Sequence, residues 1–380
     1  MSLPPLSLYI HIPWCVRKCP YCDFNSHEIK EQPDEAQYIE RLLSDLRADI
    51  PATGERPIHS IFIGGGTPSV FRAESIAALL NGIKQQTTLT EHCEITLEAN
   101  PGTFEQDRYR GYAQAGINRL SIGVQSFNSN HLKALGRIHD QDQACLAIEQ
   151  ALKAGFNGVN IDLMFGLPEQ STQQALADLQ QAISFNTAHL SWYQLTIEPN
   201  TAFYHSPPPL PEDEGIWDIQ EQGQQMLAEA GFSQYEVSAY AKADQPCRHN
   251  TNYWQFGDYL GIGAGAHAKL TTESGIKRFH KYRHPKQYMN NLSFIAGENT
   301  LGKSDIVYEF MLNALRLKNG VPVNIFEQHS QMPFAAIEHL WQNGVDHGLL
   351  SPIEKTKPRL KTTETGFNFL NDSVNVFEAE

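Results

Sequence analysis

Through the first two-thirds of the chain, short apolar runs alternate with longer stretches whose apolar residues recur every three or four positions. The short runs have the length and β-rich composition of strands, and the longer ones have the periodicity of amphipathic helices. Strands are expected at residues 7–12, 60–63, 93–99, 119–125, 158–164, 189–197 and 235–240. Helices are expected at residues 34–50, 73–85, 105–115, 142–154, 172–185 and 211–230. Asp34 is the expected cap of the first helix, and Gly116, Gly155 and Gly231 close later ones.

This alternation predicts an α/β fold in which parallel strands are joined by crossover helices. In parallel barrels, the functional residues gather where strands end and loops begin. The candidates that follow the expected strands are Cys15, residues 64–68, Glu98, Gln125 and Asp162. The sequence therefore predicts one site at the carboxyl ends of the strands.

The pattern changes from about Lys303 onward. Helices are expected at 306–317, 323–328 and 333–343, then a hairpin at 349–352 and 358–362, and a helical stretch from Thr365. Helices followed by a small hairpin are typical of a winged-helix-like module, but this segment holds seven basic and ten acidic residues. A DNA reader needs a basic face, so we expect a structural or partner-docking role. We divide the chain into a barrel (1–240), a connecting region (241–300) and this domain (301–380).

Composition and charge narrow the class of protein. The chain has 380 residues with 29 basic and 43 acidic side chains, a formal charge of −14. This charge argues against nucleic-acid binding and allows at most a peripheral membrane association. No signal-peptide pattern opens the chain, and no apolar run approaches the ~18 residues of a spanning helix. A cytoplasmic protein is expected.

Three of the six cysteines, Cys15, Cys19 and Cys22, are separated by three and then two residues. Zinc sites mostly use paired Cys-x-x-Cys arms with a fourth protein ligand, whereas a tight loop of thiolates is typical of an iron–sulfur cluster. A loop of buried free thiols is the alternative. Clustered thiolates need a reducing compartment, and the remaining cysteines are expected to be ordinary thiols.

The run 64–68, Gly-Gly-Gly-Thr-Pro, follows an expected strand and precedes a helix. It lacks the lysine of a phosphate-binding loop, so taken alone it indicates a plain strand–helix turn. With the cysteines upstream, we expect its glycines to allow a ligand close to the backbone. The later run 261–266, Gly-Ile-Gly-Ala-Gly-Ala, is a weak dinucleotide signal, and we expect it to close the same pocket.

The three-cysteine spacing, Tyr21 before the last cysteine and the glycine run together resemble the radical S-adenosylmethionine (SAM) superfamily. The resemblance implies a partial (β/α)6 barrel followed by the small helical, winged-helix-like domain. It implies a 4Fe–4S cluster on Cys15, Cys19 and Cys22, with SAM at the open iron. The implied SAM positions are Tyr9, Tyr21, Gly65, Gly66, Thr67, Glu98, Gln125, Arg137 and Asp162.

A further cluster, His249-Asn-Thr-Asn-Tyr253-Trp254, lies outside the alternating part. An exposed histidine beside large aromatic residues could bind heme iron while the rings cover the macrocycle. The residues alone favour a structural, hydrogen-bonded histidine.

Over nearly its whole length, the chain resembles the group that contains the oxygen-independent coproporphyrinogen III oxidases and the related heme chaperones. The oxidases carry another cysteine where this chain has Phe24, and they have a longer N-terminal segment. The His249 cluster is typical of the chaperone branch, so the resemblance implies heme at His249, Tyr253 and Trp254, with His267 as the next candidate ligand. It also implies hemoprotein acceptors such as respiratory enzymes, and it leaves a homodimer open. Radical decarboxylation of coproporphyrinogen III is the alternative function.

Overall fold

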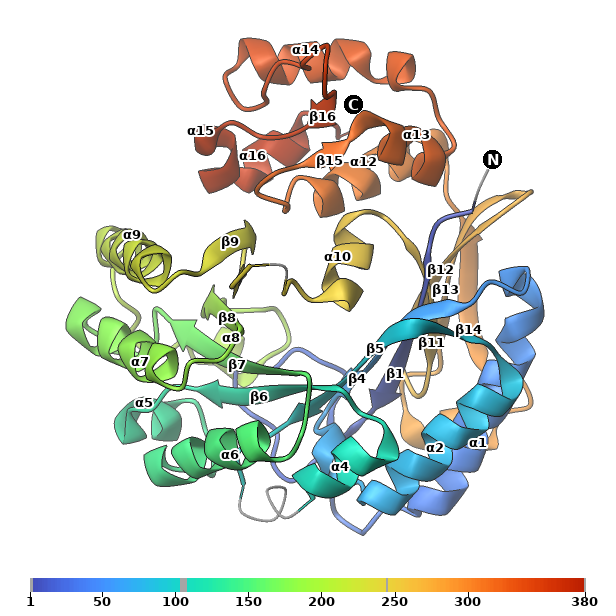
Figure 1. Cartoon of the computed structure of the whole chain (residues 1–380), viewed down its shortest axis with the longest axis vertical. Helices are drawn as coiled ribbons and strands as arrows, with labels where there is room; N and C mark the ends of the chain where they lie inside the picture. Colours follow the sequence, from blue (N-terminus) through green and yellow to red (C-terminus); the bar gives the residue numbers. More distant parts are fainter. Residues whose placement is uncertain (1–2, 103–107, 244, 379–380) are drawn as a thin grey trace.

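A computed structural model describes residues 3–102, 108–243 and 245–378. Its centre is a row of six parallel strands in sequence order, which confirms the predicted partial (β/α)6 barrel (Figure 1). The strands are β1 (Leu6–Ile12), β4 (Ile58–Gly65), β5 (Leu89–Ala99), β6 (Arg119–Gln125), β7 (Gly158–Phe165) and β8 (His189–Gln194). The strand β4 runs two residues into the glycine run, because Gly64 and Gly65 still pair with β1.

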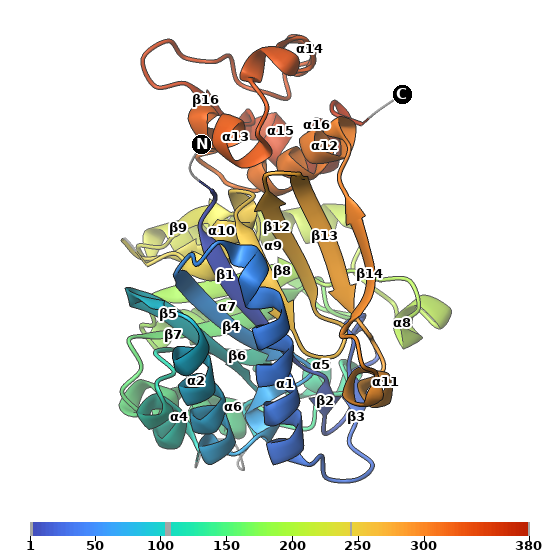
Figure 2. The ribbon, with the colours of Figure 1, turned by 90° about the vertical axis from the view of Figure 1, so that its right-hand side faces the viewer.

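Helices cover the outer face of these strands (Figures 1 and 2). They are α1 (Glu35–Asp49), α2 (Ala73–Gln86), α4 (Tyr109–Ala115), α5 (Ser129–Ala134), α6 (Gln141–Lys153), α7 (Thr172–Ser184) and α9 (Asp213–Glu229). The short helix α8 (Ala202–His205) instead lies beside the cysteine loop, where the Phe203 amide donates to the Pro20 carbonyl. The Asp34 side chain accepts from the Gln37 amide and caps α1 as predicted, and capping boxes begin α6 and α7. The expected helix at 105–115 begins outside the described residues. Alternate β1 residues such as Leu8 and Ile10 are fully buried in the core that includes Leu42 of α1.

Both edges of the parallel row are extended, giving a twelve-stranded sheet. Next to β1 lie β11 (Asp258–Ile262), which is parallel, and then the antiparallel strands β12 (His267–Thr272), β13 (Gly275–Lys281) and β14 (Ile295–Thr300). Beyond β8 lie β10 (Ala239–Ala241) and β9 (Ser233–Glu236). The single strand expected at 235–240 was therefore wrong, because the chain turns at 237–238 and forms an antiparallel hairpin.

The C-terminal residues form a largely helical module beside α10 (Arg248–Trp254) (Figures 1 and 2). Its elements are α12 (Lys303–Ala314), β15 (Val321–Pro322), α13 (Val323–Ser330), α14 (Glu338–Asp346), β16 (Arg359–Leu360), α15 (Glu364–Asn368) and α16 (Leu370–Asn375). The hairpin expected at 349–362 is reduced to one bridge, between Leu350 and Thr362, because β16 pairs with β15 instead. The segment boundaries at 240 and 300 stay a prediction.

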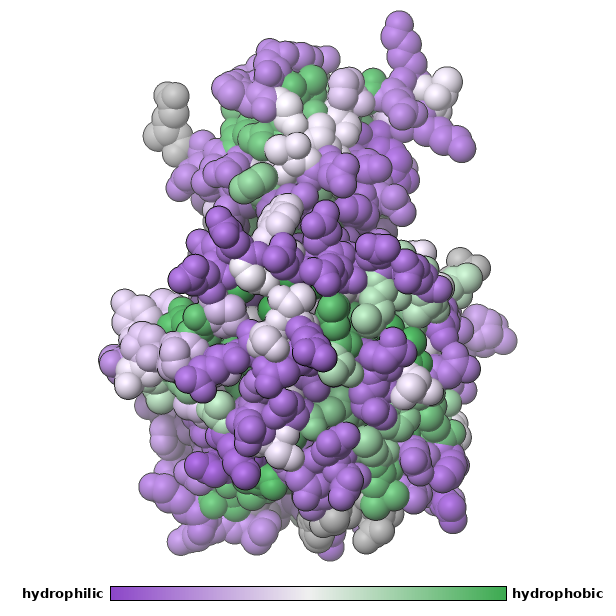
Figure 3. All heavy atoms as spheres, turned by 90° about the vertical axis from the view of Figure 1, so that its left-hand side faces the viewer, coloured by the Kyte–Doolittle hydropathy of each residue, from purple (hydrophilic) through white to green (hydrophobic). Residues whose placement is uncertain are grey.

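The outer surface agrees with the amphipathic pattern of the helices. The side that carries α7 and α9 is mostly hydrophilic, with hydrophobic groups interspersed (Figure 3). Among the described helices, none has both the length and the apolar character needed to cross a membrane.

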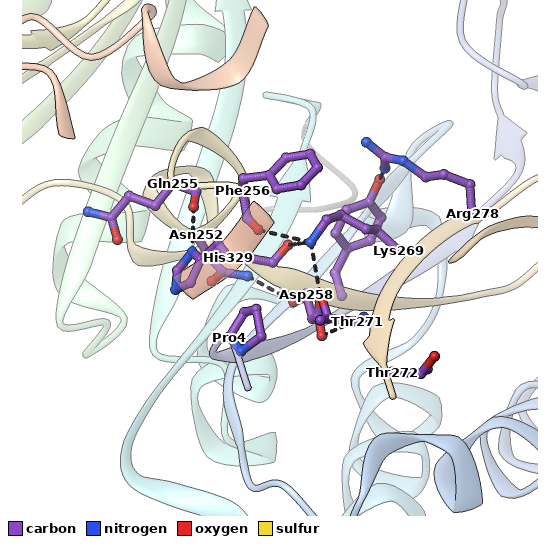
Figure 4. A network of polar contacts seen from close by, with 12 residues as sticks. Pro4, Asn252, Gln255, Phe256, Asp258, Lys269, Thr271, Thr272, Arg278 and His329 are labelled. Atoms are coloured by element: carbon purple, nitrogen blue, oxygen red, sulfur yellow. Dashed lines mark hydrogen bonds and ion pairs between the residues drawn. The ribbon is translucent and has the colours of Figure 1, made fainter. Parts of the chain in front are cut away.

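A buried polar network joins the sheet to the C-terminal module (Figure 4). The Lys269 ammonium lies 2.9 Å from Asp258 Oδ1 and also donates to the carbonyl of Phe256. Arg56 Nη1 lies 2.7 Å from the other carboxylate oxygen. Burial alone would raise the pKa of Asp258, but Lys269 and Arg56 hold it below its usual value. The network thus compensates a buried carboxylate from both sides.

We expect Asp258→Ala to lower the free energy of unfolding by about 3–5 kcal/mol, because it leaves the Lys269 charge buried without its partner. Urea unfolding of the full chain measures this loss. Glu273→Ala is the matched control, since Glu273 is exposed in the turn between β12 and β13 and its removal should change stability by less than about 0.5 kcal/mol. Equal losses in the two variants would contradict the account.

Candidate functional site

The three clustered cysteines line a cavity of about 390 Å³ at the carboxyl ends of the parallel strands. Cys15 ends the short strand β2 (Trp14–Cys15), which pairs with β3 (His27–Glu28) and so closes the cysteine loop at its base. Cys15 is buried, whereas Cys19 and Cys22 are half-buried. Burial raises the pKa of the Cys15 and Cys22 thiols, and hydrogen bonds from Thr67 and Ser26 partly offset this.

The other three cysteines lie away from this cavity. Cys93 is in β5, Cys145 in α6 and Cys247 directly before α10. All six are free thiols. Within the described chain, no three His, Cys, Asp or Glu side chains gather closely enough to hold a single metal ion.

The glycine run packs against the cysteine loop with no room for side chains. A Cβ on Gly66 would lie 2.5 Å from the carbonyl oxygen of Trp14, and Gly65 has a φ of +119°. The amides of Gly66 and Thr67 donate to the carbonyls of Ile12 and Trp14, at 2.7 Å each. Gly65, Gly66 and Thr67 line the cavity, so the expected close backbone approach is present.

Two carboxyl groups, Glu98 and Asp162, project from β5 and β7 into the same cavity. Glu98 Oε2 accepts from the Gly65 amide at 3.2 Å. Burial, followed by the nearby Asp162 charge, raises the pKa of Glu98 from 4.5 to about 8. Burial also raises the pKa of Asp162, whose oxygens accept from Ser121 (2.8 Å) and Asn160 (2.7 Å).

Arg137 supplies a cation to this cavity. Its guanidinium lies 3.8 Å from Cys19 Sγ and donates to Asn100 Oδ1 (2.8 Å) and the Gly123 carbonyl (2.6 Å).

Gln125 has a φ of +68°, unusual for a non-glycine residue, and accepts from the Tyr193 hydroxyl at 2.9 Å. Tyr21 also lines the cavity, and its ring packs near Phe203.

A second cavity, of about 670 Å³, contains His249 and Tyr253 of α10 in its wall. The His249 ring stacks on Phe62 (4.9 Å between centroids) and meets Tyr253 edge-on (4.6 Å). Burial lowers the pKa of His249 to about 3, so the imidazole is neutral at neutral pH. Its Nδ1 lies 3.4 Å from Ser60 Oγ, whereas its buried Nε2 has no hydrogen-bond partner among the described residues.

The two cavities have a common wall. Phe24, Gly65 and Glu98 line both of them. Phe24 is 60% exposed despite its size. Ligands bound in the two cavities would therefore lie next to each other.

Three expected placements differ from the structure. Tyr9 lines the second cavity instead of the first, because β1 lies next to β11 and the Tyr9 ring packs toward Phe62 and His249. The 261–266 run does make close approaches, but Gly265 lines the second cavity. Trp254 lies outside the wall of either cavity, with the Arg316 guanidinium 4.3 Å from its ring centroid. Successive side chains of a helix point about 100° apart, so Trp254 points away from the face that His249 and Tyr253 share.

Several lining residues were not expected from the sequence. In the first cavity they include Asn100 and Tyr193, and in the second His11, Phe62, Tyr259, His280 and Arg283. Asn100 follows the end of a strand and could have been found by that position. The residues of the second cavity carry no local signal, since they meet only through the pairing of distant strands.

The chain matches the family model of the radical SAM superfamily over residues 9–182. The barrel and its cysteine cavity thus define a radical SAM protein. It is 51% identical to heme chaperone HemW of Haemophilus influenzae, covering 100% of this chain and 99% of the relative. It is 47% identical to HemW of Escherichia coli, covering 100% of both chains. The chain therefore belongs to the HemW family.

Two further comparisons extend this likeness. A mouse protein, radical S-adenosyl methionine domain-containing protein 1, mitochondrial, is 34% identical over 85% of this chain and 75% of its own length. The solved structure of coproporphyrinogen III oxidase (HemN) from Escherichia coli has a TM-score of 0.83 at 22% identity, covering 99% of this chain and 91% of that one. At that identity, the likeness shows a shared fold.

Membership of the radical SAM superfamily implies a 4Fe–4S cluster and SAM. The residues present fit both groups. Three thiols share one cavity with an arginine beside Cys19, and Gly65 and Gly66 contribute to the wall of that cavity without side chains.

We expect Glu98→Gln to remove a pH-dependent loss of stability from the cluster-free chain. The unfolded Glu98 releases its proton near pH 4.5, whereas the folded one keeps it until about pH 8, so the unfolded state binds fewer protons between these values. Glu98 should therefore contribute a fall in the free energy of unfolding of the wild type as the pH rises from 5 to 8, and the variant should lose this component. Urea unfolding at several pH values measures it.

Glu91→Gln is the control, because Glu91 is exposed on the same strand, β5. This control should keep the pH dependence of the wild type. Parallel pH profiles for the wild type and Glu98→Gln would show that Glu98 is ionised in the folded chain.

Proposed function

We propose that this protein is a heme chaperone that holds a 4Fe–4S cluster and SAM in the first cavity and heme in the second, and that it delivers heme to hemoproteins. The observation that carries this proposal is the buried Nε2 of His249, without a partner among the described residues, in an aromatic cavity beside the cysteines. A buried polar atom without a partner costs about 1–3 kcal/mol, which coordination to iron would offset. The relatives named heme chaperone HemW support the same function.

In the first cavity, Cys15, Cys19 and Cys22 would hold the cluster. When bound, the cluster supplies a redox-active iron with a position open to SAM. The chain then provides polar partners for SAM: the backbone around Gly65 and the side chains of Glu98, Gln125, Arg137 and Asp162. Arg suits a carboxylate, and Asp suits ribose hydroxyls.

In the second cavity, the neutral imidazole of His249 has a lone pair for iron. Tyr253, Tyr9 and Phe62 provide flat apolar faces for a macrocycle. The volume of about 670 Å³ lies within the ~300–1,000 Å³ of small-molecule sites. Trp254 acts outside the cavity, where it packs α10 against the C-terminal module.

Phe24 favours the chaperone over the oxidase. It stands where the resembling oxidases carry a further cysteine, and its ring lines both cavities. We therefore expect no conversion of coproporphyrinogen III. Respiratory hemoproteins as acceptors, a homodimer and a cytoplasmic location, where clustered thiols stay reduced, belong to the same proposal.

We expect the reconstituted wild-type chain to hold four irons, and Cys15→Ser, Cys19→Ser and Cys22→Ser each to lose the cluster and the SAM-induced change in its spectrum. Iron and sulfide analysis with electron paramagnetic resonance measures both. Cys145→Ser is the control, since Cys145 is half-buried in α6 and away from the cavity. Loss of the cluster from this control, with retention in the other variants, would overturn the assignment.

We expect His249→Ala to weaken heme binding or shift the heme absorption spectrum while the iron–sulfur content stays unchanged. Heme titration of the reconstituted chain measures this, and His339→Ala, an exposed histidine on α14, is the control. Normal heme binding by His249→Ala would move the ligand elsewhere, with His267→Ala the next variant to test. Measurable decarboxylation of coproporphyrinogen III together with no heme binding would reject the chaperone.

A further inference from the structure

The second cavity has a buried aromatic part and an exposed basic part. His249 is only 2% exposed, whereas His267 and Arg283 are exposed and His280 is half-buried. All four line the same cavity. The cavity is therefore polarised from an apolar interior to a basic mouth.

The basic part is a built feature of the β12–β13 hairpin. His267 and His280 are paired residues of its two strands, and their rings stack with centroids 5.5 Å apart. Two hydrogen bonds hold the backbone of the residues that follow β13. The Asn25 side chain donates to the Arg283 carbonyl at 2.8 Å, and the Gly265 amide donates to the Tyr282 carbonyl at 2.9 Å. These bonds anchor the backbone of Arg283 at the cavity.

Within the part of the chain that the structure describes, no carboxylate compensates the charge of Arg283. Glu98 is the sole acidic residue among the described residues of the cavity wall. Burial keeps the Glu98 carboxyl protonated at neutral pH, with a pKa of about 8. Burial, followed by the His280 and arginine charges, lowers the pKa of His267. Although the net charge of the chain is −14, the described wall of this cavity therefore presents a cation without an ionised acid.

We propose that Arg283, with His267 and His280, forms a carboxylate-binding subsite that holds the propionates of a tetrapyrrole whose centre lies toward His249. The proposal rests on the proposed function, because it names the part of the heme cavity that recognises the ligand's acid groups. A guanidinium offers two parallel N–H donors to one carboxylate, and the two imidazoles offer further N–H donors at the mouth. The ligand would thus be oriented by its iron at the buried end and by its propionates at the exposed end.

The test compares heme with its dimethyl ester, in which both propionates are esterified and uncharged, on the full cluster-reconstituted chain. Arg283→Gln should weaken heme binding roughly tenfold and leave ester binding unchanged. Raising the ionic strength should weaken the binding of heme to the wild type more than that of the ester, because Arg283 is exposed and screened. His267→Gln combined with His280→Gln should add to the loss for heme alone.

Lys286→Gln is the matched control. Lys286 carries the same charge as Arg283, lies three residues further along the chain, and is exposed outside the cavity wall. Heme binding unchanged in Arg283→Gln, or weakened equally for heme and ester, would overturn the subsite while leaving the chaperone proposal intact. A wild-type chain that binds neither heme nor ester would instead overturn the proposed function, and the subsite with it.

Discussion

The close approach of the glycine run to the cysteine loop is the constraint on which the rest of the site depends. A Cβ at Gly66 would collide with the Trp14 backbone, and one at Gly65 would lie 2.7 Å from the His11 ring. Because both positions lack side chains, the amides of Gly66 and Thr67 reach the carbonyls on either side of Pro13. Those bonds fix the start of the cysteine loop against β4. The Gly65 amide also donates to the Glu98 carboxyl, so the position of the glycine run helps to place Glu98 in the wall between the two cavities.

That wall carries little charge, and this follows from burial. Glu98 stays protonated in this wall, and His249 stays neutral in the second cavity, because burial disfavours the charged form of each side chain. The cations of the cavities lie elsewhere: Arg17 and Arg137 line the first cavity, with Arg137 beside Cys19, and Arg283 lies at the mouth of the second. A neutral partition with a cation in each compartment suits two anionic or carboxylate-bearing ligands that are held close together.

The sequence was sufficient for the features that depend on local patterns. Helix periodicity and capping located α1 and α6 to within a residue or two, and the 119–125 strand was found at its observed bounds. The cysteines and strand-end carboxyls were predicted to share a site, and they do. The second cavity could not be foreseen, because Phe62, His249 and Arg283 meet only after β11 pairs with β1 and the β12–β13 hairpin folds beside them. Trp254 was misplaced because adjacency in sequence was taken for a shared helix face.

The role of the C-terminal module follows from the shortness of α10. Seven residues cannot sustain a helix in water by themselves, so the direction of its histidine face must be set by contacts on its other sides. The module supplies these contacts: Arg316 covers the Trp254 ring, and His329 Nδ1 lies 2.6 Å from the Gln255 carbonyl (Figure 4). On the barrel side, Asn252 donates to Ser7 and to the Asp258 carbonyl, and a Cβ on Gly257 would overlap the Asn252 side chain. The helix is thus held between hydrogen bonds to the barrel side and packing against the C-terminal core. A domain that lies outside both cavities therefore still determines where the imidazole of His249 is held.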